Sequence, residues 1–170
     1  MPKINRIEIF VNPEITPDQL WDFYVRNHIC EEGYGKDLAC RPLRHSSLIV
    51  GAFEDDKLIG ISRAMFDGLS ASIMEFSLDL EYQGNKIAYR NGSLIGNDIE
   101  GIGLKMGKIL LDELDKMGAF FISYSVLRNY EELFFQLLGF ESHGDAISYV
   151  IDKRPYLGDK KYVTRRNSEL

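Results

Sequence analysis

Two glycines, Gly101 and Gly103, stand at the start of a stretch with the spacing of an amphipathic helix. Glycine has no Cβ, so the backbone there can come close to an anion. The free N–H groups in the first turn of a helix point toward such an anion, and the helix dipole adds positive potential. The pattern predicts a cradle for a pyrophosphate, to which Ile102, Leu104 and Lys105 would contribute. A loop that only lets the helix lie close to a sheet explains the two glycines equally well.

The surrounding residues predict an ordered series of strands and helices. Short β-prone runs predict strands at residues 5–11, 47–54, 58–66, 69–80, 119–126 and 146–152. Apolar residues at three- and four-residue spacing predict helices that begin after Thr16 and that cover 104–117 and 130–138. The three strands between 47 and 80 are joined by tight turns and form an antiparallel meander, and the strand after the next helix pairs in parallel with the last of them. The polar residues 29–45 form either a short second helix or a connecting loop.

Composition and charge narrow the class of protein. The 170 residues are 45% hydrophobic and 12% aromatic, which is enough to bury a substantial core. Residues 160–170 hold four basic residues and one acid, so the formal charge of −6 becomes −9 for residues 1–159, and duplex nucleic acid is disfavoured as a partner. No apolar run approaches the roughly 20 residues that cross a bilayer. We therefore expect a cytoplasmic protein with no membrane partner.

The cysteines and histidines show no metal-binding pattern. Cys30 and Cys40 stand in a polar segment far from any other pair of ligands, so we expect reduced structural thiols. His28, His45 and His143 are also too scattered for a zinc site. The sequence thus predicts no bound metal.

The order of the predicted elements, which includes Leu-Leu-Gly-Phe at residues 137–140, resembles the GNAT acetyltransferase superfamily. Members of this superfamily transfer acetyl from acetyl-CoA to amines. The resemblance covers residues 5–152 and rests on pattern more than on identity. It implies an α/β fold with a mixed, mostly antiparallel central sheet and helices on both faces. It also implies that acetyl-CoA is the cosubstrate and lies between the fourth and fifth strands, where backbone N–H groups near Leu78, Asp79 and Leu80 would polarise the thioester carbonyl.

The chain departs from the family pattern between Gln83 and Gly101. In the family a Gln or Arg stands three residues before the first glycine of the pair. Here residues 85–100 intervene, and Asp98 takes that position with the wrong charge for a pyrophosphate. Asn91-Gly92 within this insertion predicts a two-residue hairpin turn. We expect the hairpin to point outward and leave the cradle intact; the alternative is a hairpin that covers the cradle and prevents CoA binding.

Candidate acid and base residues are few. The family has a Tyr in the last helix that donates a proton to the leaving thiolate, and its position here holds Phe135. The family's Asn near the start of that helix, which would contact the pantetheine, is matched one residue late by Asn129. Glu75 is the candidate general base, and the alternative is that it is a surface residue of its strand. Strict alternation of side chains places Glu75 and Phe76 on opposite faces of the sheet, unless a β-bulge changes the phase. Tyr124 is a weaker candidate acid, with core packing as its alternative.

These features together predict an acetyl-CoA-dependent N-acetyltransferase that acts on a primary amine of a small molecule or peptide. The alternative is a GNAT-like module that binds or regulates without catalysis. We expect one domain at residues 1–155 and a charged C-terminal tail at 156–170. That tail is either frayed or an arm that reaches a second subunit in a homodimer.

Overall fold

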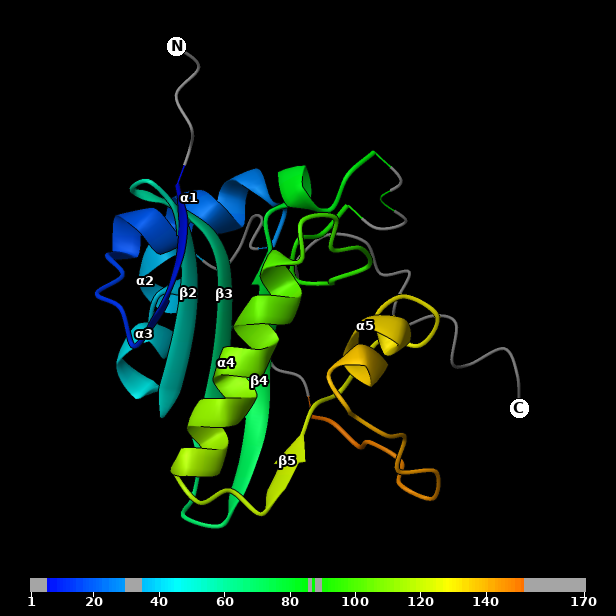
Figure 1. The fold of residues 1–170 in the computed structure, drawn as a ribbon. Helices are drawn as coiled ribbons and strands as arrows, with labels where there is room; N and C mark the ends of the chain where they lie inside the picture. The colour runs from blue at the N-terminus through cyan, green and yellow to red at the C-terminus, as the bar shows by residue number, and fades with distance from the viewer. Residues whose placement is uncertain (1–5, 30–34, 86, 88–89, 152–170) are drawn as a thin grey trace.

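The computed structural model describes residues 6–29, 35–85, 87 and 90–151, and its centre is a five-stranded sheet (Figure 1). The strands are β1 (Ile7–Val11), β2 (Leu48–Glu54), β3 (Lys57–Phe66), β4 (Ser70–Leu78) and β5 (Phe121–Ser123). They lie in chain order across the sheet; β1 to β4 are antiparallel to their neighbours, and β4 and β5 are parallel. The predicted mixed, mostly antiparallel sheet is therefore confirmed.

Helices cover both faces of this sheet. They are α1 (Pro17–Arg26), α2 (Gly35–Ala39), α3 (Pro42–His45), α4 (Ile102–Lys116) and α5 (Glu132–Leu137), with a single 3₁₀ turn, η1 (Leu80–Tyr82). Figure 1 shows α4 across one face and α1 to α3 on the other. The polar segment after α1 therefore holds two short helices rather than one.

Local sequence signals explain where the two long helices begin and end. Thr16 Oγ1 accepts a hydrogen bond from the backbone N–H of Gln19 at 3.1 Å, and Gln19 Oε1 accepts from the N–H of Thr16 at 3.0 Å, with Pro17 in the first helical position. This reciprocal cap fixes the start of α1. After α4, Gly118 has φ of 90°, a left-handed conformation that ends the helix as the sequence predicts.

The core is divided by the sheet into two clusters. Leu20 and Phe23 of α1 pack with Ile61 on one face, and Met106 and Leu110 of α4 pack with strand residues on the other face. All five side chains are fully buried. Each of these two helices therefore buries its apolar stripe against one face of the sheet.

A bulge in β4 changes which residues face each helix. Arg63 of β3 pairs with Glu75, but the next residue of β3, Ala64, pairs with Ile73, so Met74 is an extra residue in β4. Phe76 and Ile73 both belong to the core beneath α4, although alternation would place them on opposite faces. The bulge leaves Glu75 on the α1 face.

The C-terminal part of the described chain differs most from the prediction. β5 is three residues long rather than eight, and residues 146–151 form no strand, with Tyr149 and Ile151 about nine-tenths exposed. That prediction is wrong: β-prone residues form a strand only where they pair with a neighbouring strand, and residues 146–151 make no such pairing with the sheet. Asp152 and the predicted tail at 156–170 lie outside the described residues.

The orientation of α5 also differs from the sequence pattern, which predicts that Leu133, Phe134, Leu137 and Leu138 face inward. Phe134 and Phe135 are the buried residues of this helix, while Leu133 and Leu137 are 78% and 73% exposed. Leu133, Phe134 and Phe135 are consecutive, and they cannot all face inward because successive side chains on a helix point about 100° apart. The two aromatic rings fill the space beside β4, and the leucines remain in solvent.

Candidate functional site

The candidate site lies where β4 and β5 separate. The two strands pair in parallel only at Ser70–Ser72 and Phe121–Ser123, and β4 then continues to Leu78 while β5 ends. Figure 1 shows the chain after β5 turning away toward α5, with the N-terminus of α4 near the far end of β4. The parting of the strands, the end of β4 and the start of α4 are thus the elements that position the predicted site residues.

Glu75 lies in a buried polar network on the α1 face rather than on the surface. Its Oε2 accepts hydrogen bonds from the Tyr24 hydroxyl at 2.7 Å and from Arg63 Nε at 2.6 Å. Its Oε1 accepts from the Ser77 hydroxyl at 2.9 Å. The Arg63 side chain, 13% exposed, also donates to Ser46 Oγ at 3.2 Å. The surface role considered for Glu75 is therefore wrong, because its side chain is only 8% exposed.

The electrostatics of this network favour an ion pair. Burial alone would lower the pKa of Arg63, but the Glu75 carboxylate and the Tyr24 hydroxyl more than offset that effect and hold the pKa above its ordinary value. Both oxygens of Glu75 already accept hydrogen bonds. A carboxylate held in this way is a structural link between α1, β3 and β4, and it would have to exchange a partner to act as a base.

The three predicted backbone donors at the end of β4 all have partners inside the protein. The N–H of Leu78 donates to the carbonyl of Gly92 at 3.1 Å, and the N–H of Asp79 donates to the carbonyl of Ile59 at 2.8 Å. The N–H of Leu80 donates to the Asn27 side chain at 2.9 Å. Asp79 is itself paired with Arg26 Nε at 2.8 Å. The partner of Leu78 comes from the insertion.

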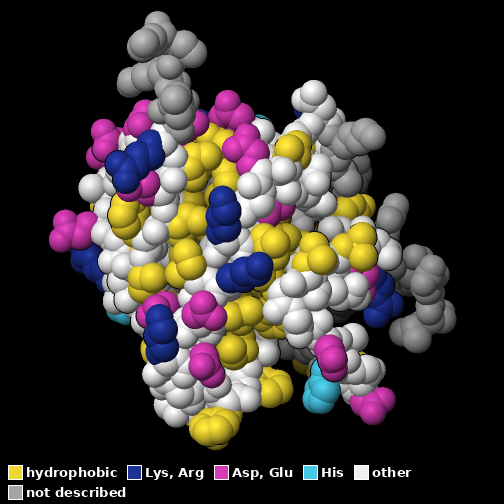
Figure 2. Space-filling view, in the orientation of Figure 1, with side chains coloured by type: hydrophobic (Ala, Val, Ile, Leu, Met, Phe, Trp, Pro, Cys, Tyr) yellow, Lys and Arg dark blue, Asp and Glu magenta, His cyan; other side chains and the backbone are white. Residues whose placement is uncertain are grey.

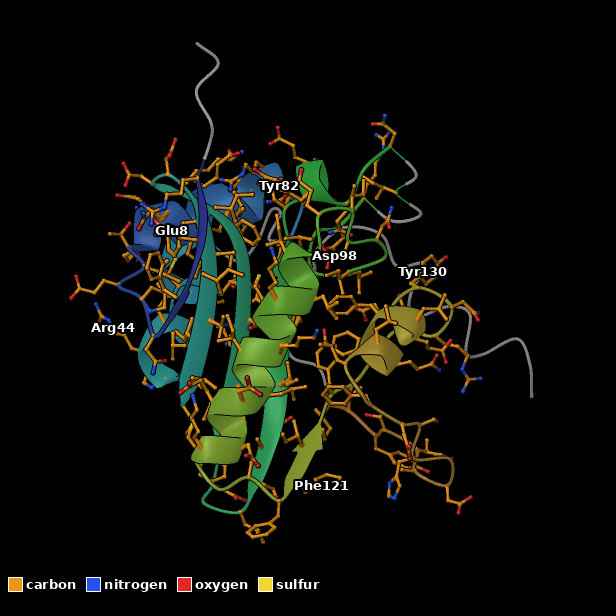
Figure 3. The ribbon with its side chains drawn as sticks, in the orientation of Figure 1. Glu8, Arg44, Tyr82, Asp98, Phe121 and Tyr130 are labelled. Carbon is orange, nitrogen blue, oxygen red and sulfur yellow. The ribbon has the colours of Figure 1, made fainter. Side chains whose placement is uncertain are left out.

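The N-terminus of α4 is also bound by the insertion. The carboxylate of Asp98 accepts hydrogen bonds from the N–H of Gly103 at 3.2 Å and from the N–H of Leu104 at 2.7 Å. Figure 3 shows Asp98 beside this end of the helix. Gly101 precedes the helix in a left-handed conformation with φ of 69°, and Ile102 is buried in the core. Glycine residues thus shape a turn that binds an anion, and the anion in the structure is a side chain of the same chain.

Gly103 is required for a second reason, which is close packing. A Cβ at this position would lie 2.5 Å from Cδ1 of Ile95 and 3.3 Å from both Asp98 Oδ2 and a ring carbon of Phe134. Ile95 is fully buried. The structure therefore gives this glycine a packing role, and a larger residue there would displace the insertion.

The prediction of an outward hairpin is wrong for the part of the insertion that the structure describes. We refer to residues 91–98 as the insertion segment; it contains no strand, and Ile95 enters the core beneath α4. The N–H of Gly96 donates to the Gln83 side chain at 3.2 Å, which links the segment to the end of η1. Apolar burial explains the inward path, since Ile95 would otherwise expose its whole side chain. Lys86, Ala88 and Tyr89 lie outside the described residues.

The remaining predicted residues divide between surface and core. Lys105 and Asn129 are exposed, and the N–H of Asn129 donates to the Glu132 carboxylate at 2.9 Å. The Phe135 ring is 2% exposed and lies 4.5 Å from the ring of Tyr124, centroid to centroid. Burial, with Glu131 and Glu75 nearby, raises the pKa of Tyr124 and makes its hydroxyl a weaker acid. Tyr124 and Phe135 therefore lie side by side in the aromatic cluster beside β4.

Glu131 is a polar residue of this region that the sequence does not single out. It is 1% exposed, and its carboxylate accepts from the N–H of Leu127 at 2.8 Å and of Ile95 at 3.4 Å. Burial raises its pKa to about 7, although these two hydrogen bonds act in the opposite direction. Acidic residues are common at the start of helices. The sequence around Glu131 therefore gives no sign that this side chain is buried and contacts the insertion segment.

Other classes of site have little support among the described residues. The part of the chain described here contains no group of three or more His, Cys, Asp or Glu side chains able to hold a metal ion. In the same ranges, no helix combines the length and hydropathy needed to cross a membrane. Figure 2 shows basic and acidic side chains interspersed over the face that carries α4, without a continuous basic surface.

Comparisons with known proteins identify the fold. No family model matches the sequence, and no curated protein is similar to it in sequence. The chain is similar in structure to a probable acetyltransferase from meticillin-resistant Staphylococcus aureus, with a TM-score of 0.65, 15% identity and coverage of 86% of this chain and 99% of that one. A GNAT-family acetyltransferase from Streptococcus pneumoniae gives a TM-score of 0.64, 19% identity and coverage of 88% and 100%.

A third solved structure contains CoA. It is an aminoglycoside N-acetyltransferase in complex with CoA, with a TM-score of 0.60, 12% identity and coverage of 89% of this chain and 98% of that one. At identities of 12 to 19%, these similarities show the fold and do not identify a substrate. The mixed sheet, the parallel β4–β5 pair and the whole-length structural matches together show that this chain has the fold of the GNAT acetyltransferases.

Proposed function

We propose that the protein is an acyl-CoA-dependent N-acyltransferase that transfers acetyl from acetyl-CoA to a primary amine of a small molecule or peptide. The observation that carries the proposal is the separation of β4 from β5 beyond Ser72 and Ser123, in a fold whose structural neighbours include an acetyltransferase in complex with CoA. The backbone donors at the end of β4 and at the start of α4 lie around this opening.

The residues at the start of α4 fit a pyrophosphate in their chemistry. Two N–H groups, from Gly103 and Leu104, already bind one carboxylate, which shows that an anion is stabilised at this helix end. At Gly101 a Cβ would meet nothing within 4 Å, so the side of the turn is open. In the proposal these N–H groups hold the pyrophosphate, Lys105 adds nearby positive charge, and Leu78 to Leu80 supply N–H groups for the thioester carbonyl.

The proposed reaction depends more on positioning than on acid–base groups. When bound, acetyl-CoA supplies an activated acyl group that an amine can attack directly. Holding amine and thioester in contact contributes about 7 to 11 kcal/mol to lowering the barrier. Glu75, bound to Arg63 and Tyr24, would take a proton only after exchanging a hydrogen bond. Asn129 and Phe135 remain proposed pantetheine contacts.

The second candidate, a non-catalytic GNAT-like binding or regulatory module, is supported by the insertion. Its Gly92 carbonyl and Asp98 carboxylate already bind the N–H groups of Leu78, Gly103 and Leu104. A chain that has lost CoA binding would have no need of these donors for a ligand. The domain bounds, the cytoplasmic location and the homodimer stay predictions under either candidate.

Calorimetric titration with CoA and with acetyl-CoA, followed by a thiol-release assay with a panel of primary amines, tests the two candidates. The proposed enzyme binds both nucleotides, and at least one amine accelerates release of free CoA above the rate of hydrolysis. Binding without any amine-dependent release supports the non-catalytic module. An absence of binding for both nucleotides would overturn the proposed enzyme.

A further inference from the structure

The insertion segment accepts hydrogen bonds from backbone N–H groups of two elements, β4 and α4. In the proposed function, acyl-CoA would need these same N–H groups. The Gly92 carbonyl accepts from Leu78 at the end of β4, and the Asp98 carboxylate accepts from Gly103 and Leu104 at the start of α4. The two ends of the insertion segment therefore contact the two places where the proposed function puts the thioester and the pyrophosphate. The inference below rests on that proposed function.

Asp98 is chemically close to the group that it would replace. Like a phosphate, its carboxylate carries negative charge and offers two oxygens to neighbouring N–H groups, here at 3.2 and 2.7 Å. Hydrogen bonds of backbone N–H groups to an ionised acceptor are stronger than those to a neutral one. Two anions cannot share the same pair of N–H groups, so a pyrophosphate at this helix end requires the carboxylate to leave.

The segment between these two ends is seated by specific contacts. Ile95 fills the space over Gly103 and is fully buried, and the N–H of Ile95 contacts Glu131 Oε1 at 3.4 Å. Gly92 fits between β4 and Asn27, because a Cβ there would lie 2.8 Å from Cβ of Asn27. Its own N–H donates to the Asn27 carbonyl at 2.9 Å. These contacts come from α1, β4, α4 and the turn before α5, so the position of the segment is built into the fold.

We propose that the insertion segment, residues 91–98, is an internal competitor for acyl-CoA, and that Asp98 is the residue that determines how tightly the cosubstrate binds. In the absence of nucleotide, Asp98 caps α4. Binding of acyl-CoA exchanges this carboxylate for the pyrophosphate, and the affinity measured for CoA is reduced by the free energy of the cap. The segment thereby links occupancy of the phosphate position to the end of β4, where Gly92 binds Leu78.

The experiment measures CoA affinity by calorimetric titration of four full-length proteins: the wild type, Asp98→Ala, Asp98→Asn and Glu100→Gln. Loss of a side-chain cap costs a helix about 1 kcal/mol, so Asp98→Ala should bind CoA about five- to tenfold more tightly than the wild type. Asp98→Asn keeps one acceptor oxygen and should gain less. Glu100→Gln is the matched control, because Glu100 is an exposed neighbouring acid and its loss removes the same charge without freeing either N–H.

The outcomes separate this inference from the function on which it rests. If the wild type binds CoA and Asp98→Ala binds no more tightly, the competitor is overturned and the proposed enzyme stands. If Glu100→Gln gains as much as Asp98→Ala, general charge repulsion explains the gain and the competitor is again overturned. If neither the wild type nor the Asp98 variants bind CoA, the proposed function itself fails.

A second measurement covers the case in which Asp98→Ala does not fold. Amide chemical shifts of the wild-type protein are followed as CoA is added, with attention to Gly92, Asp98, Gly103 and Leu104. The competitor predicts that all four amides shift with the same midpoint, because the segment and the helix exchange partners together. Saturation with CoA that leaves Gly92 and Asp98 unshifted would overturn it.

Discussion

Glu75 and Asp98 are both acidic side chains that accept hydrogen bonds within the protein, yet their partners differ in kind. Glu75 accepts hydrogen bonds from three side chains that belong to α1, β3 and β4. Asp98 accepts from two backbone N–H groups at the open end of α4. Side-chain partners recognise one carboxylate in one place, whereas the end of a helix binds any anion that reaches it. The first carboxylate is therefore part of the stability of the fold, and the second is suited to exchange with a ligand.

The largest effect that this comparison predicts is at the Glu75–Arg63 pair. Replacing Glu75 by Ala leaves the Arg63 guanidinium, which is 13% exposed, without its carboxylate. Removing one member of a buried pair costs about 3 to 5 kcal/mol, since the other charge remains desolvated. Urea denaturation should show a loss of this size in the free energy of unfolding.

A double replacement controls for the loss of packing at this pair. With Glu75→Met and Arg63→Met together, no charge remains unpaired, and the double variant should be more stable than Glu75→Ala alone. A loss below about 1 kcal/mol for the single variant would mean that Arg63 reaches solvent when its partner is removed, and that the network contributes little to stability.

Ile95 should give the next largest effect, because it tests whether the insertion segment is part of the core. The side chain is fully buried, and truncation to Ala should cost about 2 to 4 kcal/mol in the free energy of unfolding. Ile99, four residues further along the chain and 61% exposed, is the matched control and should lose less than about 1 kcal/mol on the same change. If urea denaturation shows equal, small losses in unfolding free energy for the two variants, the segment lies outside the core and points outward.

Deletion of residues 86–96 is therefore not expected to leave the free energy of unfolding unchanged, although the Asn-Gly pair suggests a surface hairpin.

The sequence correctly predicts features that are determined locally. The cap formed by Thr16 and Gln19 and the end of α4 at Gly118 each depend on residues within a few positions. The periodicity of α4 also predicts its buried face, since Met106, Leu110 and Leu114 are all fully buried.

The features that the sequence does not predict depend on distant contacts. Ile95 is buried because Gly103 has no Cβ to exclude it, and neither residue reveals the other. The bulge at Met74 is a property of the β3–β4 register. Residues 146–151 have strand-like composition, but they form no strand in the structure. Within the site, the glycines indicate that the N–H groups of Gly103 and Leu104 can bind an anion. The sequence does not indicate that this anion is Asp98, because that contact depends on the path of the insertion segment.

A smaller, pH-dependent effect should come from Glu131. Folding raises its pKa from 4.5 to about 7, so between these values the folded chain keeps a proton that the unfolded chain has released. This carboxyl therefore stabilises the fold below about pH 4.5, and that contribution is lost as the pH rises through 7. The loss attributable to Glu131 should be about 1 to 3 kcal/mol.

The measurement for Glu131 is the slope of unfolding free energy against pH, compared between the wild type and Glu131→Gln. The variant cannot titrate at this position, so its stability should fall less than that of the wild type between pH 4.5 and 7. The slope is the readout because the absolute stability of the variant also reflects an altered hydrogen bond to Ile95. Identical slopes would show that the carboxyl is solvated in the folded protein.

The smallest effect tests how Glu75 divides its stabilisation among its donors. Tyr24→Phe removes the hydroxyl that donates to Oε2 at 2.7 Å, while Arg63 and Ser77 still bind the carboxylate. Hydrogen bonds to charged groups contribute about 1.5 to 3 kcal/mol, and the remaining donors can tighten, so the loss in unfolding free energy should be near 1 kcal/mol. Tyr149→Phe, at a ring that is 90% exposed, is the control and should change nothing measurable. If Tyr24→Phe costs as much as Glu75→Ala, the hydroxyl and not the ion pair holds α1 to β4, and the assignment of the network to Arg63 and Glu75 is wrong.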